Sequence, residues 1–260
     1  MTAARTDEGP LDTEPLSGEL PARVATACRV LGRLGATHST FGHVSCRDGD
    51  DRMLIRGKGP DETGLRFTVP GDVVGVSFDV AKLDGRAGLR PPSESFLHAW
   101  LYRLRPDAGA VIHMHPESVV LLTICGRGLQ PVYGAYGRGA QLAVEGVPVY
   151  DSSLTISNPQ RGKAFAEFMG NSRAALLRGH GVAVVGRTIE EAAVTTMELK
   201  ELADVTYRAL QIGEPAELSA DEQAEIAVLH RGDRPLGSAG GAKGTEAMWR
   251  YYLSAAGEQD

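Results

Sequence analysis

Two spacings of apolar side chains run along the chain, and together they predict a mixed α/β domain. Near-helical spacing appears in residues 21–34, 94–104, 117–125, 158–169 and 188–212. Short apolar runs typical of strands lie between them, at residues 44–47, 53–55, 73–78, 108–115, 147–150 and 174–185. Helices and strands alternate irregularly, which favours a layered α/β domain with a mixed or antiparallel sheet over a doubly wound parallel sheet.

The boundaries of the periodic segments predict one domain over residues 19–230, because no linker divides them. Residues 1–18 are polar and acidic and are expected to form a disordered tail. That tail has no apolar stretch of the kind found in secretory signals. Residues 231–260 read as a glycine-rich linker followed by an aromatic C-terminal tail, which is expected to dock on the domain.

The composition argues against nucleic acid and membranes as binding partners. Of the 260 residues, 42% are hydrophobic and 23% charged, and the formal net charge is −6 with lysines and arginines scattered. Nucleic acids and anionic membranes favour basic faces. The longest apolar stretch, residues 119–125, is too short to span a bilayer. Three cysteines without a CxxC motif indicate free thiols and a cytoplasmic protein.

The sharpest chemical signal is His113-Met114-His115 at the end of an expected strand. Side chains two residues apart on a strand point to the same face, about 7 Å apart along the backbone, so both imidazoles can converge on one ion. The alternative is one core histidine and one exposed histidine.

Two further residues are candidates for the same chemistry. His180 lies between two glycines at the turn of an apolar hairpin, where the small neighbours let its imidazole approach a bulky group. Glu94 is expected in the first turn of a helix capped by Ser93, where the helix dipole favours a carboxylate. His98, one turn later, is expected to pack or to support the site, and not to bind metal. Taken singly, His180 is equally explained as a turn histidine and Glu94 as a helix-start residue.

The order of these motifs resembles the class II aldolase/adducin family, which includes fuculose-phosphate aldolase and ribulose-phosphate 4-epimerase. The resemblance covers residues 20–212 and rests on four separated segments: Pro92-Ser93-Glu94 with His98, the pattern Asp-Ala-x-Ala-Val-x-His-x-His at 107–115, Leu-Leu at 176–177, and His180-Gly181. It implies a three-layer α/β/α fold around a mostly antiparallel central sheet. It also implies a homotetramer whose active sites lie between subunits.

The resemblance assigns roles to individual residues. It implies that His113, His115 and His180 bind one divalent metal ion per chain, zinc first, with manganese, cobalt or iron as alternatives. It implies that Glu94 is the acid–base group. The adducin branch keeps the fold without the metal histidines, so their presence favours an enzyme over an adducin-like binding module.

The phosphate-binding loops of the family's sugar-phosphate enzymes are altered in this sequence. Gly42-His43 replaces Gly-Asn, the segment 56–59 (Arg-Gly-Lys-Gly) replaces a Thr-Gly turn, and one serine before Glu94 is missing. We expect His43, Arg56, Lys58 and Ser93 to contact a substrate that is carboxylated instead of phosphorylated. For Arg56 and Lys58, a solvated loop is the alternative.

These observations predict a divalent-metal-dependent carbon–carbon lyase. The preferred reaction is decarboxylation of a hydroxylated aromatic or enolic carboxylate, resembling the family's dihydroxyphthalate decarboxylases. The alternatives are an aldolase acting on a hydroxy-carbonyl compound or sugar phosphate, a non-haem iron oxygenase, and the binding module. Candidate second proton donors are the tyrosines Tyr251 and Tyr252 of the tail, or Tyr133 and Tyr136.

Overall fold

The computed structural model describes residues 16–229 and 242–258. Within these residues one sheet of eight strands has the order β4-β3-β2-β1-β5-β8-β7-β6. Every neighbouring pair is antiparallel except β6 and β7. The strands are β1 (His43–Arg47), β2 (Arg52–Arg56), β3 (Val73–Ser77), β4 (Lys82–Asp84), β5 (Ala110–Met114), β6 (Val149–Tyr150), β7 (Ala174–Leu177) and β8 (Gly181–Gly186).

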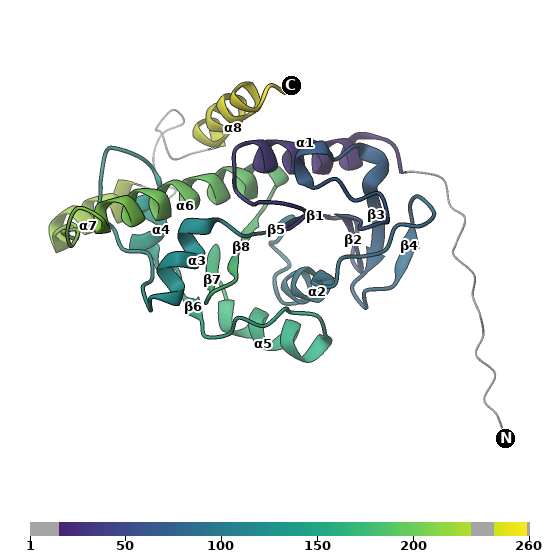
Figure 1. Ribbon diagram of the computed structural model, residues 1–260, viewed down its shortest axis with the longest axis horizontal. Helices are drawn as coiled ribbons and strands as arrows, with labels where there is room; N and C mark the ends of the chain where they lie inside the picture. The colour runs from purple at the N-terminus through teal and green to yellow at the C-terminus, as the bar shows by residue number, and fades with distance from the viewer. Residues whose placement is uncertain (1–15, 230–241, 259–260) are drawn as a thin grey trace.

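Helices cover both faces of the sheet, which gives the three layers visible in Figure 1. One face is covered by α2 (Ser95–Leu104) and α5 (Pro159–Met169). The opposite face is covered by α1 (Glu19–Arg33), α3 (Glu117–Ile124), α4 (Gly139–Glu145), α6 (Ile189–Leu210) and α8 (Ala242–Ala256). The short helices η1 (Leu65–Phe67) and η2 (Pro70–Asp72) contact α1, and α7 (Ala220–Leu229) contacts α4. The predicted α/β/α fold with a mostly antiparallel sheet is therefore confirmed.

Strict alternation along the central strand β5 divides the core into two. Ile112 and Met114 face the layer of α1, α3 and α6, whereas Val111 faces the layer of α2 and α5. His113 has the same parity as Val111, so it also points toward α2. This parity decides which helix meets the metal-binding motif.

Helix α2 begins one residue later than the sequence indicated. Ser93 is not its N-cap: the N-cap position is occupied by Glu94, whose side chain makes no capping hydrogen bond. The start of α6 matches the prediction, because the hydroxyl of Thr188 accepts a hydrogen bond from the backbone N–H of Glu191. Freed from capping, the Glu94 carboxylate is available for contacts beyond its own helix.

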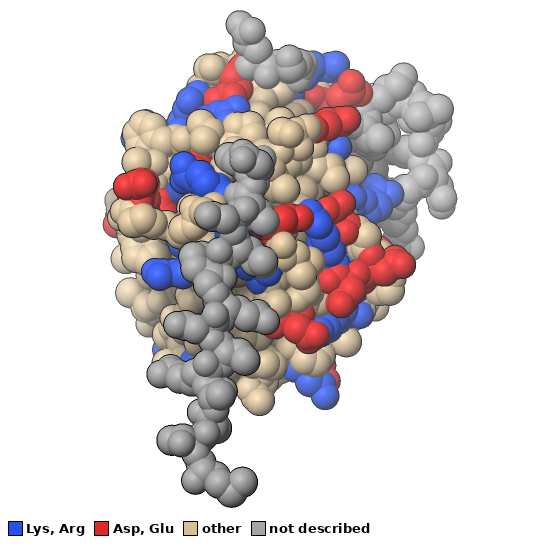
Figure 2. Space-filling model, turned by 90° about the vertical axis from the view of Figure 1, so that its right-hand side faces the viewer, with Lys and Arg blue, Asp and Glu red and all other residues tan. Residues whose placement is uncertain are grey.

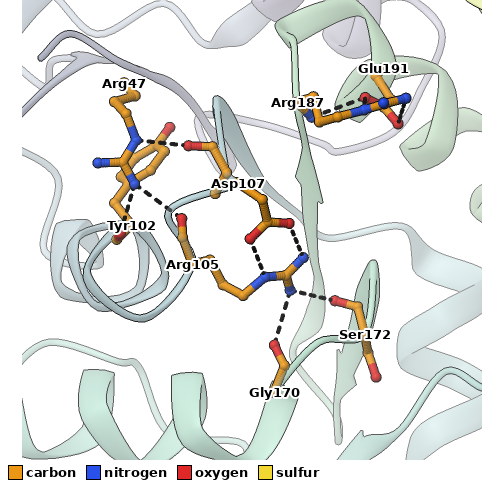
Figure 3. A network of polar contacts seen from close by, with 9 residues as sticks. Arg47, Tyr102, Arg105, Asp107, Gly170, Ser172, Arg187 and Glu191 are labelled. Carbon is orange, nitrogen blue, oxygen red and sulfur yellow. Dashed lines mark hydrogen bonds and ion pairs between the residues drawn. The ribbon is translucent and has the colours of Figure 1, made fainter. Parts of the chain in front are cut away.

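Two arginines fix the C-terminal end of α2 against the sheet (Figure 3). The guanidinium of Arg105 donates to both carboxylate oxygens of Asp107 at 2.8 Å and to the carbonyl of Gly170 at 2.9 Å. The guanidinium of Arg47, on β1, donates to the carbonyl of Tyr102 at 2.7 Å. Because α2 is held to β1 and to the end of α5, its N-terminal end is held at a defined distance from β5.

Residues 1–15, the N-terminal part of the expected tail, and residues 230–241, the expected linker, lie outside the described residues. The expected aromatic tail is helix α8, whose Tyr252 and Leu253 are buried in the core that α6 lines.

Acidic and basic side chains intermingle on the face near β3 and β4 (Figure 2). No helix among the described residues is long and apolar enough to cross a membrane.

Candidate metal centre

Four side chains from β5, α2 and the β7–β8 turn converge at one end of the central strands of the sheet. Glu94, His113, His115 and His180 each offer one ligand atom, and these atoms all lie within 4.8 Å of one another. His113 is in β5 and His115 directly follows that strand, while His180 lies in the turn between β7 and β8. Because β5 pairs with β8, the end of β5 and the turn before β8 lie side by side.

The tautomer of His113 follows from its hydrogen bond. Its Nδ1 lies 2.9 Å from the carbonyl oxygen of Val182, and a carbonyl only accepts, so Nδ1 carries the proton. In a neutral ring the Nε2 atom is then a bare lone pair. That Nε2 lies 2.9 Å from Nε2 of His115 and 3.2 Å from Oε2 of Glu94. A lone pair facing a carboxylate oxygen is repulsive unless a proton or a cation lies between them.

Close backbone packing brings the other two histidines to His113. The His115 and His180 rings have centroids 4.9 Å apart, the same separation as His113 and His180. A Cβ on Gly181 would lie 2.2 Å from the Met114 carbonyl oxygen and 2.9 Å from Cδ2 of His115, so only glycine fits. The glycine after His180, noted in the sequence for backbone freedom, is therefore required for close approach to β5.

Glu94 is buried, with 4% of its surface exposed. Its Oε1 accepts a hydrogen bond from the backbone N–H of Ile156 at 3.1 Å and lies 3.5 Å from Nε2 of His180. Burial alone raises the pKa of the Glu94 carboxyl, but positive charge on His113 and hydrogen bonds from His113 and His180, when these rings are protonated, hold that pKa well below its usual range. A cation bound between the neutral rings would supply positive charge at the same place. The Glu94 carboxylate is thus ionised despite its burial.

The residues fit a divalent cation. Three imidazoles and one carboxylate are ligand types that suit zinc and its first-row neighbours. The Nδ1 of His113 is fixed on a carbonyl, the arrangement that orients metal-binding histidines in general. The lone pairs of His113 Nε2 and the Glu94 carboxylate face each other, and a cation bound between them would remove their repulsion.

A buried polar group lies behind the cluster. The hydroxyl of Ser45 bridges Nδ1 of His98 at 2.7 Å and the hydroxyl of Tyr102 at 2.8 Å. His98 is fully buried, as its expected supporting role requires, and burial lowers its pKa to about 3. The His43 ring is close to the rings of both His98 and His113, with its centroid 6.0 Å from each. Its Nδ1 is buried without a hydrogen-bond partner in the described structure.

Glu62, a residue that the sequence analysis did not identify, pairs with both cationic side chains expected at the substrate, Arg56 and Lys58. Arg56 is 3% exposed, pairs with Glu62 and donates to the hydroxyl of Thr68 at 3.0 Å. Its parity with Leu54 places it on the α1 face of the sheet, opposite His113. Lys58 donates to the carbonyl of Thr40 and lies 3.5 Å from Glu62. The spacing of four residues between Lys58 and Glu62 is the sequence feature that could have indicated this ion pair.

The remaining candidates are not brought to the cluster within one chain. Ser93 is exposed beside Glu94. Tyr251, Tyr252 and Tyr136 line a separate cavity of about 1010 Å³ between α4, α6, α7 and α8, and Tyr133 packs against Tyr136. None of the four clustered residues lines that cavity.

Comparison with known proteins identifies the group to which this arrangement belongs. The family model described as Class II Aldolase and Adducin N-terminal domain matches residues 22–207. A 3,4-dihydroxyphthalate decarboxylase from Arthrobacter keyseri is 34% identical over 236 residues, covering 89% of this chain and 91% of that protein. One from Rhodococcus jostii (strain RHA1) is 37% identical, covering 73% of this chain and 80% of that protein.

A solved structure shows the same fold. The L-fuculose 1-phosphate aldolase from Glaciozyma antarctica PI12 superposes with a TM-score of 0.74 at 18% identity, covering 92% of this chain and 90% of that one. The resemblance drawn from the histidine and glutamate pattern is thereby confirmed. The chain belongs to the class II aldolase and adducin family, and it is an enzyme of that family.

Proposed function

We propose that this enzyme is a divalent-metal-dependent lyase that decarboxylates a hydroxylated aromatic carboxylate resembling 3,4-dihydroxyphthalate. The observation that carries the reaction class is the convergence of three imidazoles and one buried carboxylate within 4.8 Å. When bound there, a divalent cation supplies a Lewis acid that stabilises negative charge on substrate oxygens.

Glu94 has the properties that the proton transfer needs. Its carboxylate is ionised, so it can act first as a base and take the proton of a substrate hydroxyl, which a cation bound at the cluster would make more acidic. The carbon–carbon bond to the carboxylate then breaks, CO₂ leaves, and the electron pair remains on the ring carbon. That carbon takes the proton from Glu94, and the product oxygen is reprotonated by solvent. The hydrogen bond from the Ile156 N–H keeps Oε1 in place through both transfers.

The loops around the cluster support a carboxylated substrate over a sugar phosphate. Lys58 and Arg56 share Glu62 and so lack two free positive charges for a doubly charged phosphate. Of the proposed substrate contacts, His43 is the best supported, because its buried Nδ1 lies beside His113 without a partner. The loop of Lys58 is bridged through Arg90 to the segment that carries Ser93, whereas Arg56 is buried on the α1 side of the sheet. The relatives named 3,4-dihydroxyphthalate decarboxylase, 34–37% identical to this chain, supply the substrate class.

Three finer assignments go with this proposal. We take zinc as the resident ion, with manganese, cobalt and iron as alternatives. We take the assembly as a homotetramer with sites between subunits. Of the two tail tyrosines, the exposed Tyr251 of a neighbouring copy is the candidate proton donor, because Tyr252 is buried in its own chain. The three free cysteines support a reducing, cytoplasmic location.

The test is CO₂ release from 3,4-dihydroxyphthalate by protein loaded with zinc, manganese or iron, with and without oxygen. Metal-dependent, oxygen-independent release that Glu94→Gln abolishes is the expected result. A relative 30% identical to this chain, a 5-methylthioribulose-1-phosphate/5-deoxyribulose-1-phosphate aldolase from Rhodospirillum rubrum, supplies the second candidate function. Cleavage of such a sugar phosphate without CO₂ release from the aromatic acid establishes that aldolase instead, and oxygen-dependent turnover establishes the iron oxygenase.

A further inference from the structure

An exposed aromatic ring lies against the candidate metal centre. Phe41 is 48% exposed, on the loop between α1 and β1. Its ring is stacked on the imidazole of His115, with centroids 5.4 Å apart and planes at 27°. The His38 ring is tilted against the Phe41 ring, with centroids 5.3 Å apart. A phenylalanine ring contributes to folding stability mainly through burial of its apolar surface. The exposed part of the Phe41 ring is therefore apolar surface that the described residues leave open beside the centre.

The loop holds this ring in a defined position. Gly42 has a φ of 93°, and a Cβ there would lie 2.7 Å from Sδ of Met114. Ser39 has a φ of 53°, a backbone conformation that residues other than glycine rarely adopt. Lys58 donates to the carbonyl of Thr40, so the loop is anchored immediately before Phe41 as well. Such strain persists only where the surroundings enforce it, and it fixes the position of the ring before any ligand arrives.

The ring lies on the side from which a ligand enters. His113 is fully buried and Glu94 is 4% exposed, whereas His115 and His180 are partly exposed. The centre therefore opens to solvent at His115 and His180, and Phe41 flanks that opening through its contact with His115. Its ring has no polar atom, so it discriminates by shape: it favours a flat, apolar ring over a flexible polyhydroxylated chain.

We propose that Phe41 is a specificity-determining residue whose ring stacks on the aromatic ring of the substrate while the substrate's oxygens face the cluster. The inference rests on the proposed function and adds to it the group that reads the aromatic class of substrate. Offset stacking at a preorganised ring corresponds to an affinity gain of roughly tenfold for an aromatic ligand.

The test compares Phe41→Leu with wild type, both zinc-loaded, by calorimetric titration with 3,4-dihydroxybenzoate and with tartrate. Leucine keeps an apolar side chain and removes the ring. The dihydroxybenzoate is expected to bind about tenfold more weakly to Phe41→Leu, while tartrate affinity changes less than about twofold. Phe41→Tyr, which restores a ring, is expected to restore the aromatic affinity. Phe67→Leu removes another exposed phenylalanine ring, on η1 and 59% exposed, and is the control, with no change expected.

Several results overturn this role. Equal loss for both ligands, no loss for the aromatic one, or no aromatic binding by the wild type excludes stacking on the ring. Loss of zinc or a changed sedimentation coefficient in Phe41→Leu shows instead that the ring shields His115 or packs on another subunit.

The proposed reaction fails separately. If no hydroxylated aromatic acid is decarboxylated while aromatic binding still depends on Phe41, the reaction is wrong and the stacking role stands. If CO₂ is released with the same KM by Phe41→Leu, the reaction stands and the stacking role is wrong.

Discussion

The Nδ1 atom of His113 donates a hydrogen bond to the carbonyl oxygen of Val182 across the β5–β8 pair, at 2.9 Å. The strand pairing thereby sets which nitrogen of His113 faces Glu94, His115 and His180. The orientation of the central ligand is part of the sheet itself, and it requires no separate loop to hold the imidazole.

Replacement of His113 by alanine is expected to remove the metal while the fold remains. Loss of a directly bound imidazole costs more than the roughly 10–100-fold in affinity that loss of an outer partner costs. Elemental analysis of freshly purified protein and of protein reconstituted with zinc measures the change. His38→Ala, an exposed histidine outside the cluster, is the control and keeps wild-type metal content. Full metal occupancy in His113→Ala contradicts the site.

Replacement of Glu94 by glutamine is expected to keep the metal and lower kcat by about 10²–10⁴-fold, the range for loss of general acid–base catalysis. Glutamine keeps an oxygen that accepts from the Ile156 N–H, so the loop at residue 156 stays in place. Paired measurements of kcat and metal content distinguish this variant from His180→Ala, which loses both. Turnover near the wild-type rate in Glu94→Gln refutes the assignment.

A methyl group on Gly181 is expected to damage both stability and metal binding. Its Cβ would lie 2.2 Å from the Met114 carbonyl, so β5 and β8 must separate, at a cost of about 1–3 kcal/mol. The same shift moves His115, whose Cδ2 lies 2.9 Å from that Cβ. Urea unfolding and zinc titration of Gly181→Ala measure the two effects. Gly213→Ala, with nothing within 4 Å of the added atom, is the neutral comparison.

The pKa of His98 predicts how stability depends on pH. Burial lowers this pKa from 6.5 to about 3, so between these values the unfolded chain binds a proton that the folded chain does not. Stability from this group is complete above pH 6.5 and is lost as the pH falls, with a slope approaching about 1.4 kcal/mol per pH unit. Urea unfolding of metal-free protein from pH 7.5 to 4.5 shows it.

His98→Gln is expected to have a shallower slope than the wild type over that range, whatever its stability at pH 7.5. His38→Gln, which changes an exposed histidine, is expected to keep the wild-type slope. A slope unchanged in His98→Gln means that other buried groups account for the acid sensitivity.

Local pattern determined much of this protein. The apolar periods placed α1, α2, α3, α5, α6 and the main strands within a few residues, because each buries one face and its spacing records that face. Helices α4 and α7 were missed. The short α4 begins at Gly139 and has no N-terminal capping side chain, and α7 is mostly exposed, so neither carries a clear apolar stripe.

The candidate site divides in the same way. The residue types and their order pointed to His113, His115, His180 and Glu94, and that information is present in the sequence alone. Strand pairing and side-chain parity, which only the tertiary structure shows, decided the contacts around these residues. Arg56 lies on the α1 face and pairs with Glu62, and Ser45 links His98 to Tyr102. Phe41 stacks on His115. Such contacts join residues that are distant in the chain or on different loops, and their geometry depends on the whole sheet being assembled. A one-dimensional pattern specifies the ligands, whereas only the folded sheet specifies their neighbours.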